Sequence, residues 1–462
     1  MKKGDLIDLE INSIAYGGSG LGRTEDNVVA FIKYAVPGDK VRIKVKKIKK
    51  NYIEGEISKI LEPSSFRVSP RCPHFLTCGG CQLQNLDYKK QLIEKEKQVK
   101  DSLIRIGGLD STLINSIVNP MMGMDYPWYY RNKMEYTFSR EKNEIILGLH
   151  KSGSYYQIVD IKNCYISNPI IKNILSIAKD FATKNSLTTY DQRKKMGFLR
   201  NLAIRLGVNT NQIMINLVTN KVNLKKQDFK NLKKNFIERF YYEFSPDSLL
   251  WTISTSPASA IKPEKIEVLK GNEGIEEKLN DLVFSLSFES FFQTNTKMAS
   301  TLYKIVDEYS QLKGDEVILD IYCGTGAIGL FLAKKAKRVI GIEVVEKAVQ
   351  DAYKNAEINN IKNIEFICER AEICIVKIFS DNSSVDFVIL DPPRAGVHPK
   401  IIGSLLKNRP PKIIYVSCNP TTLARDLALL TEGEYKLKKV QPIDMFPHTY
   451  HIETVSLLTS HT

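Results

Sequence analysis

The chain of 462 residues is long enough for about three domains, each with a hydrophobic core of ordinary size. Lysine and arginine exceed aspartate and glutamate by 66 to 52, and the net charge of +14 predicts an anionic partner such as nucleic acid. Apolar runs fall short of the roughly 18 residues that a membrane span needs, and polar residues interrupt the N-terminal segment. We therefore expect a cytoplasmic protein without a membrane partner, whose eight cysteines stay reduced or bind metal.

The first 62 residues predict a small β-barrel, because short alternating strands are separated by turns rich in glycine and proline. Between residues 40 and 46 cations alternate with apolar residues, which places the cations on one face of a strand. Seven cations in the eleven residues 40–50 favour a surface that contacts RNA phosphates. A solvated edge strand that uses lysine against aggregation would show the same pattern.

The region from residue 63 to 289 predicts an α+β domain and opens with a group of cysteines at a spacing typical of metal ligands. The four candidate ligands are Cys72, Cys78, Cys81 and Cys164. Gly79 and Gly80 let the backbone fold so that the second and third cysteines can face one centre. Four thiolates suit either tetrahedral zinc or an iron–sulfur cluster, and the spacing does not choose between them. Residues 126–133 mix aromatics with cations, which suits either base stacking or a strand beside the core.

The last part of the chain, from residue 290, alternates strand and helix patterns and so predicts a doubly wound parallel sheet. The patterns at 316–320, 385–390 and 413–416 indicate buried strands, and each runs into a turn with polar side chains. Ligands gather at the carboxyl ends of such strands, so we expect the functional site at that edge of the sheet.

The first of these turns, residues 324–329, matches the GxGxxG pattern, which methyltransferases share with nicotinamide enzymes. Glu343 closes the next strand, 17 residues beyond Gly326, where its carboxylate can accept both hydroxyls of a ribose. Asp320 and Asp391 add two more acidic side chains. This charge suits the sulfonium cation of S-adenosylmethionine better than the pyrophosphate of NAD.

The last turn carries Cys418, which we interpret as a nucleophile, although an isolated cysteine is more often a buried structural residue. Arg394 follows an Asp-Pro-Pro turn at the place where enzymes that methylate exocyclic amines have an aromatic residue. The combination favours carbon methylation, in which a thiolate adds to carbon 6 of uracil and makes carbon 5 nucleophilic. A general base must later remove the proton of carbon 5, and the chain offers three candidates. They are His448, His451 and Glu453.

Two other functions fit parts of the pattern. The GxGxxG match alone would suit a nicotinamide-dependent oxidoreductase. The charge alone would suit an RNA-binding protein without catalysis. Binding of S-adenosylmethionine and the effect of Cys418→Ala distinguish these functions from a methyltransferase.

Together the motifs resemble the RNA uracil-5 methyltransferases that have an N-terminal TRAM barrel and an iron–sulfur cluster, and the likeness covers nearly the whole chain. The resemblance implies an OB-like TRAM barrel at 1–62, a central α+β iron–sulfur domain at 63–289 and a Rossmann-like methyltransferase domain at 290–462. It further implies methylation of carbon 5 of uridine in 23S ribosomal RNA, with tRNA as the alternative substrate. No segment indicates an obligate protein partner.

The resemblance also assigns residues. The family's nucleophile falls on Cys418 and its general base on Glu453. Its [4Fe-4S] ligands fall on the four cysteines of the central region, which chooses this cluster over zinc. Its S-adenosylmethionine contacts fall on Gln293, Tyr322, Glu343 and Asp391. The chain departs from some relatives at Ala327, where they have asparagine, and this position is therefore left out of the cofactor site.

Overall fold

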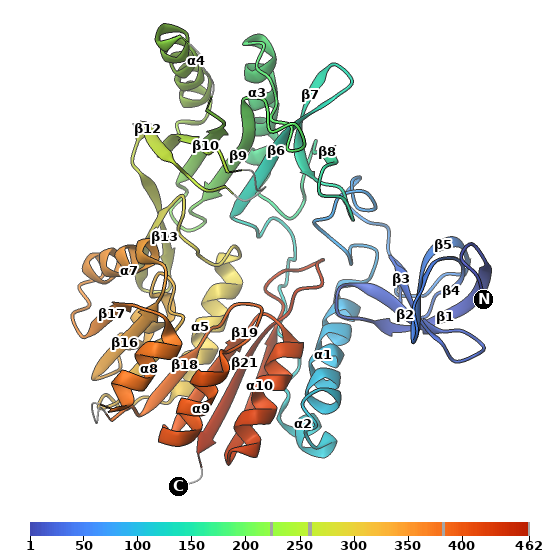
Figure 1. Cartoon of the computed structure of the whole chain (residues 1–462), viewed down its shortest axis with the longest axis vertical. Coiled ribbons are helices and arrows are strands. Elements are labelled where there is room, and N and C mark those ends of the chain that lie inside the picture. The colour runs from blue at the N-terminus through green and yellow to red at the C-terminus, as the bar shows by residue number, and fades with distance from the viewer. Residues whose placement is uncertain (222–224, 257–260, 381–383, 461–462) are drawn as a thin grey trace.

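The computed structural model describes residues 1–221, 225–256, 261–380 and 384–460. It contains a closed five-stranded barrel, a seven-stranded central sheet, a two-stranded sheet and a seven-stranded C-terminal sheet. In Figure 1 the barrel, the central sheet and the C-terminal sheet surround a central region. The red loop before the last strand extends into this region. No helix among the described residues is long and apolar enough to cross a membrane.

The predicted N-terminal barrel is confirmed, and its strands are arranged in the order β1-β2-β3-β5-β4. They are β1 (Leu6–Ile14), β2 (Ser19–Arg23), β3 (Val29–Lys33), β4 (Lys40–Ile48) and β5 (Tyr52–Glu62). In β4 the apolar side chains are buried and the cations exposed, as the alternation predicts. Because β4 pairs with both β1 and β5, it is not an edge strand. Several of its cations pair with carboxylates on these neighbours, for example Arg42 with Asp8 at 2.7 Å.

The central sheet has the order β12-β11-β10-β9-β6-β7-β8. Its strands are β6 (Lys133–Glu141), β7 (Glu144–His150), β8 (Ile158–Asp160), β9 (Leu199–Leu206), β10 (Ile213–Thr219), β11 (Ser248–Ile253) and β12 (Lys265–Gly271). Helices α3 (Ile170–Lys184) and α4 (Lys226–Phe244) share one hydrophobic core with the sheet, in which Trp251 is fully buried. A second core joins the sheet to the hairpin of β13 (Gly274–Leu279) and β14 (Leu282–Ser287).

The C-terminal sheet confirms the predicted alternation, with the order β17-β16-β15-β18-β19-β21-β20. Its strands are β15 (Val317–Ile321), β16 (Arg338–Glu343), β17 (Ile364–Cys368), β18 (Phe387–Leu390), β19 (Lys412–Ser417), β20 (Tyr435–Ile443) and β21 (Glu453–Ser460). The helices are α5 (Thr296–Ser310), α6 (Ala327–Ala333), α7 (Glu346–Ile358), α8 (Ala371–Ser380), α9 (Pro399–Asn408) and α10 (Pro420–Glu432). Strands β15 to β19 run parallel, whereas β21 is antiparallel to both of its neighbours. The carboxyl ends of the parallel strands therefore meet at one edge, beside the beginning of β21.

Two helices from the middle of the chain pack on the C-terminal sheet. They are α1 (Tyr88–Arg105) and α2 (Ser111–Ile117), and Figure 1 shows α1 beside α10. Their residues Val99, Leu103 and Ile114 are buried in the same core as the C-terminal strands. The domain limits 1–62, 63–289 and 290–462 stay a prediction, and these two helices extend the C-terminal core beyond its predicted start.

Candidate active site

Cys418 lies on the turn between β19 and α10, where the next residue, Asn419, caps the helix by accepting a hydrogen bond from Thr421 N. The thiol is half-buried. Burial raises its pKa to about 11, the charges of Glu453 and Asp391 contribute in the same direction, and the nearby Arg394 opposes them. The thiol is therefore protonated in the free protein at neutral pH.

Glu453 begins β21 and is only 5% exposed. Ser417 pairs with Thr454 across the antiparallel strands, and Cys418 and Glu453 are the residues that follow outward from this last pair. Burial raises the pKa of Glu453 well above its usual value, with a further contribution from Asp391 and an opposing one from Arg394. A carboxyl group beside the thiol can exchange a proton with a molecule bound there.

The two histidine candidates lie in different surroundings. His448 is buried, stacks on Trp128 with ring centroids 3.8 Å apart, and contacts the side chain of Gln91. Burial lowers its pKa to about 3. His451 lies beside the guanidinium of Arg394 at 3.3 Å, and burial together with that cation lowers its pKa to about 4. Both rings are neutral at pH 7, and His448 is engaged in packing.

The loop that carries these side chains, residues 444–452, is fastened from several directions. Lys95 of α1 forms an ion pair with Asp444 at 2.6 Å, and both side chains are fully buried. Tyr88, two turns earlier in the same helix, donates a hydrogen bond to the other oxygen of Asp444 at 2.9 Å. Asn295 donates to the carbonyl oxygen of Met445 at 2.9 Å. These contacts fix the loop that leads into Glu453.

The glycine-rich turn after β15 lies at the same edge of the sheet. Tyr322 and Gly326 have positive φ angles of 67° and 76°, which fold the chain sharply into α6. One carboxylate oxygen of Asp320 accepts a hydrogen bond from Gly329 N at 2.9 Å. The other oxygen is buried and has no hydrogen-bond partner among the described residues. A Cβ at Gly324 would meet open space.

Acidic groups dominate this edge. Burial raises the pKa of Asp320 to about 7, and the charge of Asp391 adds to this shift. Burial alone raises the pKa of Asp391 to about 7. Burial and mutual repulsion disfavour the ionised form of these carboxyl groups. A cation that binds among them stabilises that ionised form. The unpaired oxygen and the open space at the glycine turn therefore fit a ligand that carries a positive charge, as S-adenosylmethionine does.

Two further residues predicted to contact the cofactor flank the turn. Glu343 ends β16, and its carboxylate accepts hydrogen bonds from Gly324 N at 3.1 Å and Val344 N at 2.8 Å, which fix its orientation. Gln293 precedes α5, and the neighbouring Phe291 accepts a hydrogen bond from the hydroxyl of Thr325 in the glycine turn at 3.4 Å. The structure thus brings the segments of all four predicted contact residues to one end of the sheet.

The four cysteines of the central region lie on two segments of the chain and influence one another's pKa. The pKa of Cys78 is raised to about 11, mainly by burial and in smaller part by the charges of Cys164 and Cys72. Burial and the same neighbours raise the pKa of Cys81 as well. In the described part of the chain, no three His, Cys, Asp or Glu side chains lie close enough to hold a single metal ion. Four cysteine side chains are the usual ligands of an iron–sulfur cluster, and the cluster at these residues stays a prediction.

Comparison with known proteins identifies the two ends of the chain. Residues 2–58 match the TRAM domain, and residues 262–461 match the family described as tRNA (Uracil-5-)-methyltransferase. A Bacillus cereus protein named as an uncharacterized RNA methyltransferase is 37% identical over 459 residues, which cover 99% of this chain and 98% of the relative. A Caldanaerobacter subterraneus protein, also named as an uncharacterized RNA methyltransferase, is 38% identical over 459 residues, which cover 99% of this chain and 99% of the relative. The chain belongs to the RNA uracil-5 methyltransferase family.

A solved structure supports the same assignment for the methyltransferase. The Pyrococcus abyssi tRNA (uracil-54, C5)-methyltransferase in complex with S-adenosyl-L-homocysteine superimposes with a TM-score of 0.75 at 30% sequence identity. The match covers 97% of this chain and 99% of that one. The protein is therefore an S-adenosylmethionine-dependent RNA methyltransferase, and the alternatives of a nicotinamide enzyme and of a non-catalytic RNA-binding protein are wrong.

Sequence reasoning missed several side chains at the active site of the methyltransferase. Tyr16 of the barrel packs against Tyr450 in the loop before Glu453, and Lys95 fastens the same loop. The first lies in a turn that reads as an ordinary connection between strands. The lysine lies in a highly charged helix, where the sequence gives no sign that one charge is buried.

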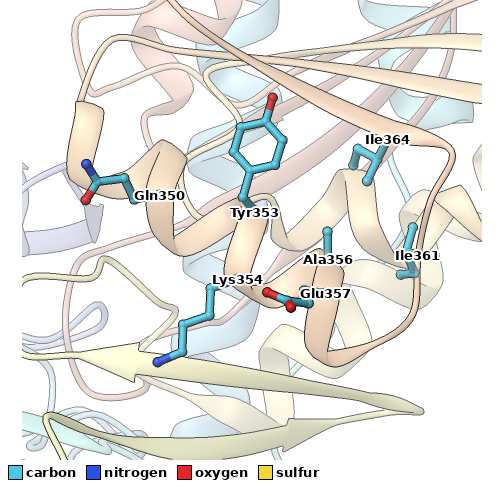
Figure 2. Close-up of a pocket in the computed structure, with 7 residues that line it drawn as sticks. All are labelled: Gln350, Tyr353, Lys354, Ala356, Glu357, Ile361 and Ile364. Atoms are coloured by element: carbon cyan, nitrogen blue, oxygen red, sulfur yellow. The ribbon is translucent and has the colours of Figure 1, made fainter.

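A cavity of about 580 Å³ lies elsewhere on the methyltransferase, at the outer side of α7. Figure 2 shows the lining residues, among them Tyr353 and Lys354 on this helix and Ile361 and Ile364 in the segment that follows it. None of the predicted catalytic or cofactor residues lines this cavity. The site assigned above is therefore defined by strand ends and turns at the sheet edge rather than by this cavity.

Proposed function

We propose that this methyltransferase makes 5-methyluridine in 23S ribosomal RNA through a covalent bond between Cys418 and carbon 6 of the target uracil. The observation that carries the proposal is the place of Cys418, on the turn just after β19, next to the start of β21 at Glu453, whose charge acts on the thiol. A nucleophile next to a proton acceptor suits a reaction in which the enzyme first bonds to the substrate and then releases it after a proton is removed.

The two side chains divide the reaction between them. Cys418 adds to carbon 6, and the electron pair of the carbon 5–carbon 6 double bond becomes available at carbon 5. S-adenosylmethionine supplies the methyl group that carbon 5 receives, and we propose that Gln293, Tyr322, Glu343 and Asp391 hold it. Glu453 then accepts the proton of carbon 5, and the electron pair of the broken carbon–hydrogen bond restores the double bond and expels Cys418 as a thiolate.

Charge regulates both roles. The raised pKa values keep Cys418 and Glu453 protonated in the free protein, whereas attack needs the thiolate and proton removal needs the carboxylate. Arg394 lowers the pKa of both groups. A cation bound beside Asp391 favours the ionised form of Glu453 in the same way, because opposite charges at close range stabilise each other.

We further propose that the four cysteines hold one [4Fe-4S] cluster with a structural or RNA-positioning role. The support is their all-thiolate donor set and the influence of their charges on one another. Methyl transfer oxidises and reduces nothing, so the reaction requires no electron from a cluster. The two residues after Cys81, Gln82 and Leu83, each donate a backbone hydrogen bond to the carbonyl oxygen of His448. This contact would transmit order at the cysteines to the active-site loop.

The choice between ribosomal RNA and tRNA rests on the combination of barrel and cysteine group, which resembles enzymes of the ribosomal type. A specific observation favours tRNA as the second candidate, because the Pyrococcus abyssi relative is named as a tRNA methyltransferase. The test is methylation of unmodified 23S rRNA and of unmodified bulk tRNA by the purified protein, followed by mapping of 5-methyluridine. We expect product in rRNA, and product confined to tRNA would overturn the ribosomal substrate.

A further inference from the structure

The turn between β1 and β2 of the barrel lies against the active-site loop. Gly18 has a φ of 86°, and a Cβ on it would lie 2.7 Å from the Cβ of Gln82 and 3.4 Å from that of Tyr450. The turn is thus wedged between the cysteine segment and the loop that leads to Glu453. Ile14 N donates a hydrogen bond to Glu94 of α1 at 3.1 Å and fixes the base of the turn. The barrel is therefore seated on the catalytic half of the molecule.

The side chain at the tip of this turn is Tyr16. Its ring meets that of Tyr450 edge-on at a centroid distance of 5.7 Å, and Tyr450 in turn lies 4.2 Å from the ring of His451. Burial raises the pKa of Tyr16, and the charges of Tyr450, Cys418 and Glu453 contribute to this rise. The barrel thus supplies an aromatic wall to a site whose other groups come from the C-terminal sheet.

The exposure of Tyr16 indicates that its role is not confined to packing between domains. The residue is 36% exposed, and within the described residues its hydroxyl has no hydrogen-bond partner. A uridine that reaches Cys418 must leave its stack, and the lost contacts are replaced in such enzymes by stacking on protein side chains. An aromatic ring accepts any base on its face, and a phenol adds a donor for a phosphate or a ribose.

We infer that Tyr16 is a substrate-positioning residue, which packs against the RNA at the target nucleotide and holds the extruded uracil against Cys418. The inference rests on the proposed role of Cys418 as the nucleophile and extends it, because the barrel then completes the active site in addition to binding RNA at a distance. Loss of the ring should slow formation of the covalent bond more than it weakens binding of the RNA as a whole.

The test uses the full-length protein and a substrate RNA with 5-fluorouridine, in which carbon 5 has no proton to lose and the adduct with Cys418 accumulates. The rate of adduct formation is measured in single turnover at saturating RNA and S-adenosylmethionine. Tyr16→Ala should lower this rate on the order of tenfold to hundredfold, the factor that loss of one base–aromatic stack produces. Tyr16→Phe keeps the ring and should stay within about threefold of the wild type, because a neutral hydrogen bond contributes less.

Tyr52→Ala is the matched control, since this tyrosine also belongs to the barrel and packs edge-on against Phe31 at 5.3 Å. It should leave the rate at saturating RNA unchanged. An unchanged rate in Tyr16→Ala, or a loss of S-adenosylmethionine binding in that variant, would overturn the inference, because the residue would then be a general RNA contact or a purely structural one. Absence of an adduct in the wild type would instead refute the role of Cys418.

Discussion

The buried ion pair between Lys95 and Asp444 provides a quantitative test of how the active-site loop is held. The two charged atoms are 2.6 Å apart, neither side chain is exposed to solvent, and burial lowers the pKa of Lys95 against the opposing effect of Asp444. Lys95→Met would leave Asp444 with the hydroxyl of Tyr88 as its remaining hydrogen-bond donor among the described side chains. Removing one partner of such a pair costs about 3–5 kcal/mol, because the other charge stays buried without compensation.

Differential scanning calorimetry can measure this cost as a shift in the midpoint temperature at which the C-terminal core unfolds. A loss of that size should lower the midpoint by about 10 °C in a unit of some 200 residues. The double variant Lys95→Met/Asp444→Leu removes both charges and should recover most of the loss. Lys97→Met, the same change at an exposed position of α1, is the control and should leave the midpoint unchanged. A shift below about 2 °C for Lys95→Met would refute the assigned role of the ion pair.

Two further predictions concern the ligands. Asp320 and Asp391, whose pKa values are raised to about 7, are largely protonated at pH 6 and ionised at pH 8, so the affinity for cationic S-adenosylmethionine should rise over this range in calorimetric titrations. S-adenosylhomocysteine, which lacks the positive sulfur, should show little change, and parallel behaviour of both ligands would contradict the electrostatic argument. Protein purified without oxygen should contain iron and sulfide, which Cys81→Ser should lose and Cys374→Ser, a buried cysteine outside the group, should retain. Stoichiometric zinc without sulfide would refute the cluster.

Local sequence patterns predicted the elements whose signal is periodic. The alternation in β4 predicted a barrel strand, and the buried runs before Asp391 and Cys418 predicted parallel strands. Because parallel strands end at one edge, their turns could be expected to meet there. The position of Glu453 next to Cys418 needed the register of an antiparallel strand, which no periodicity encodes. The sequence therefore offered Glu453 only as one of three candidate bases, and the resemblance to a family chose among them.

Contacts between distant parts of the chain explain what the sequence left open. Lys95 and Asp444 are separated by 349 positions, so neither residue reveals the other. The cations of β4 were expected to face RNA, but several meet carboxylates from neighbouring strands, as Lys46 meets Glu56 at 2.7 Å. Tyr16 shows the same limit, because its contact with Tyr450 depends on how a whole barrel docks on another domain.

The most direct test of the proposed mechanism is the fate of the RNA adduct in Glu453→Gln, with ordinary uridine in the substrate. This change keeps the size of the side chain and removes its ability to accept the proton of carbon 5, which leaves only after the bond to Cys418 and the methyl transfer. We predict that the variant accumulates a methylated protein–RNA adduct that survives denaturing electrophoresis and that Cys418→Ala forms none. Normal turnover by Glu453→Gln, or an adduct trapped by His451→Gln instead, would show that Glu453 is not the base.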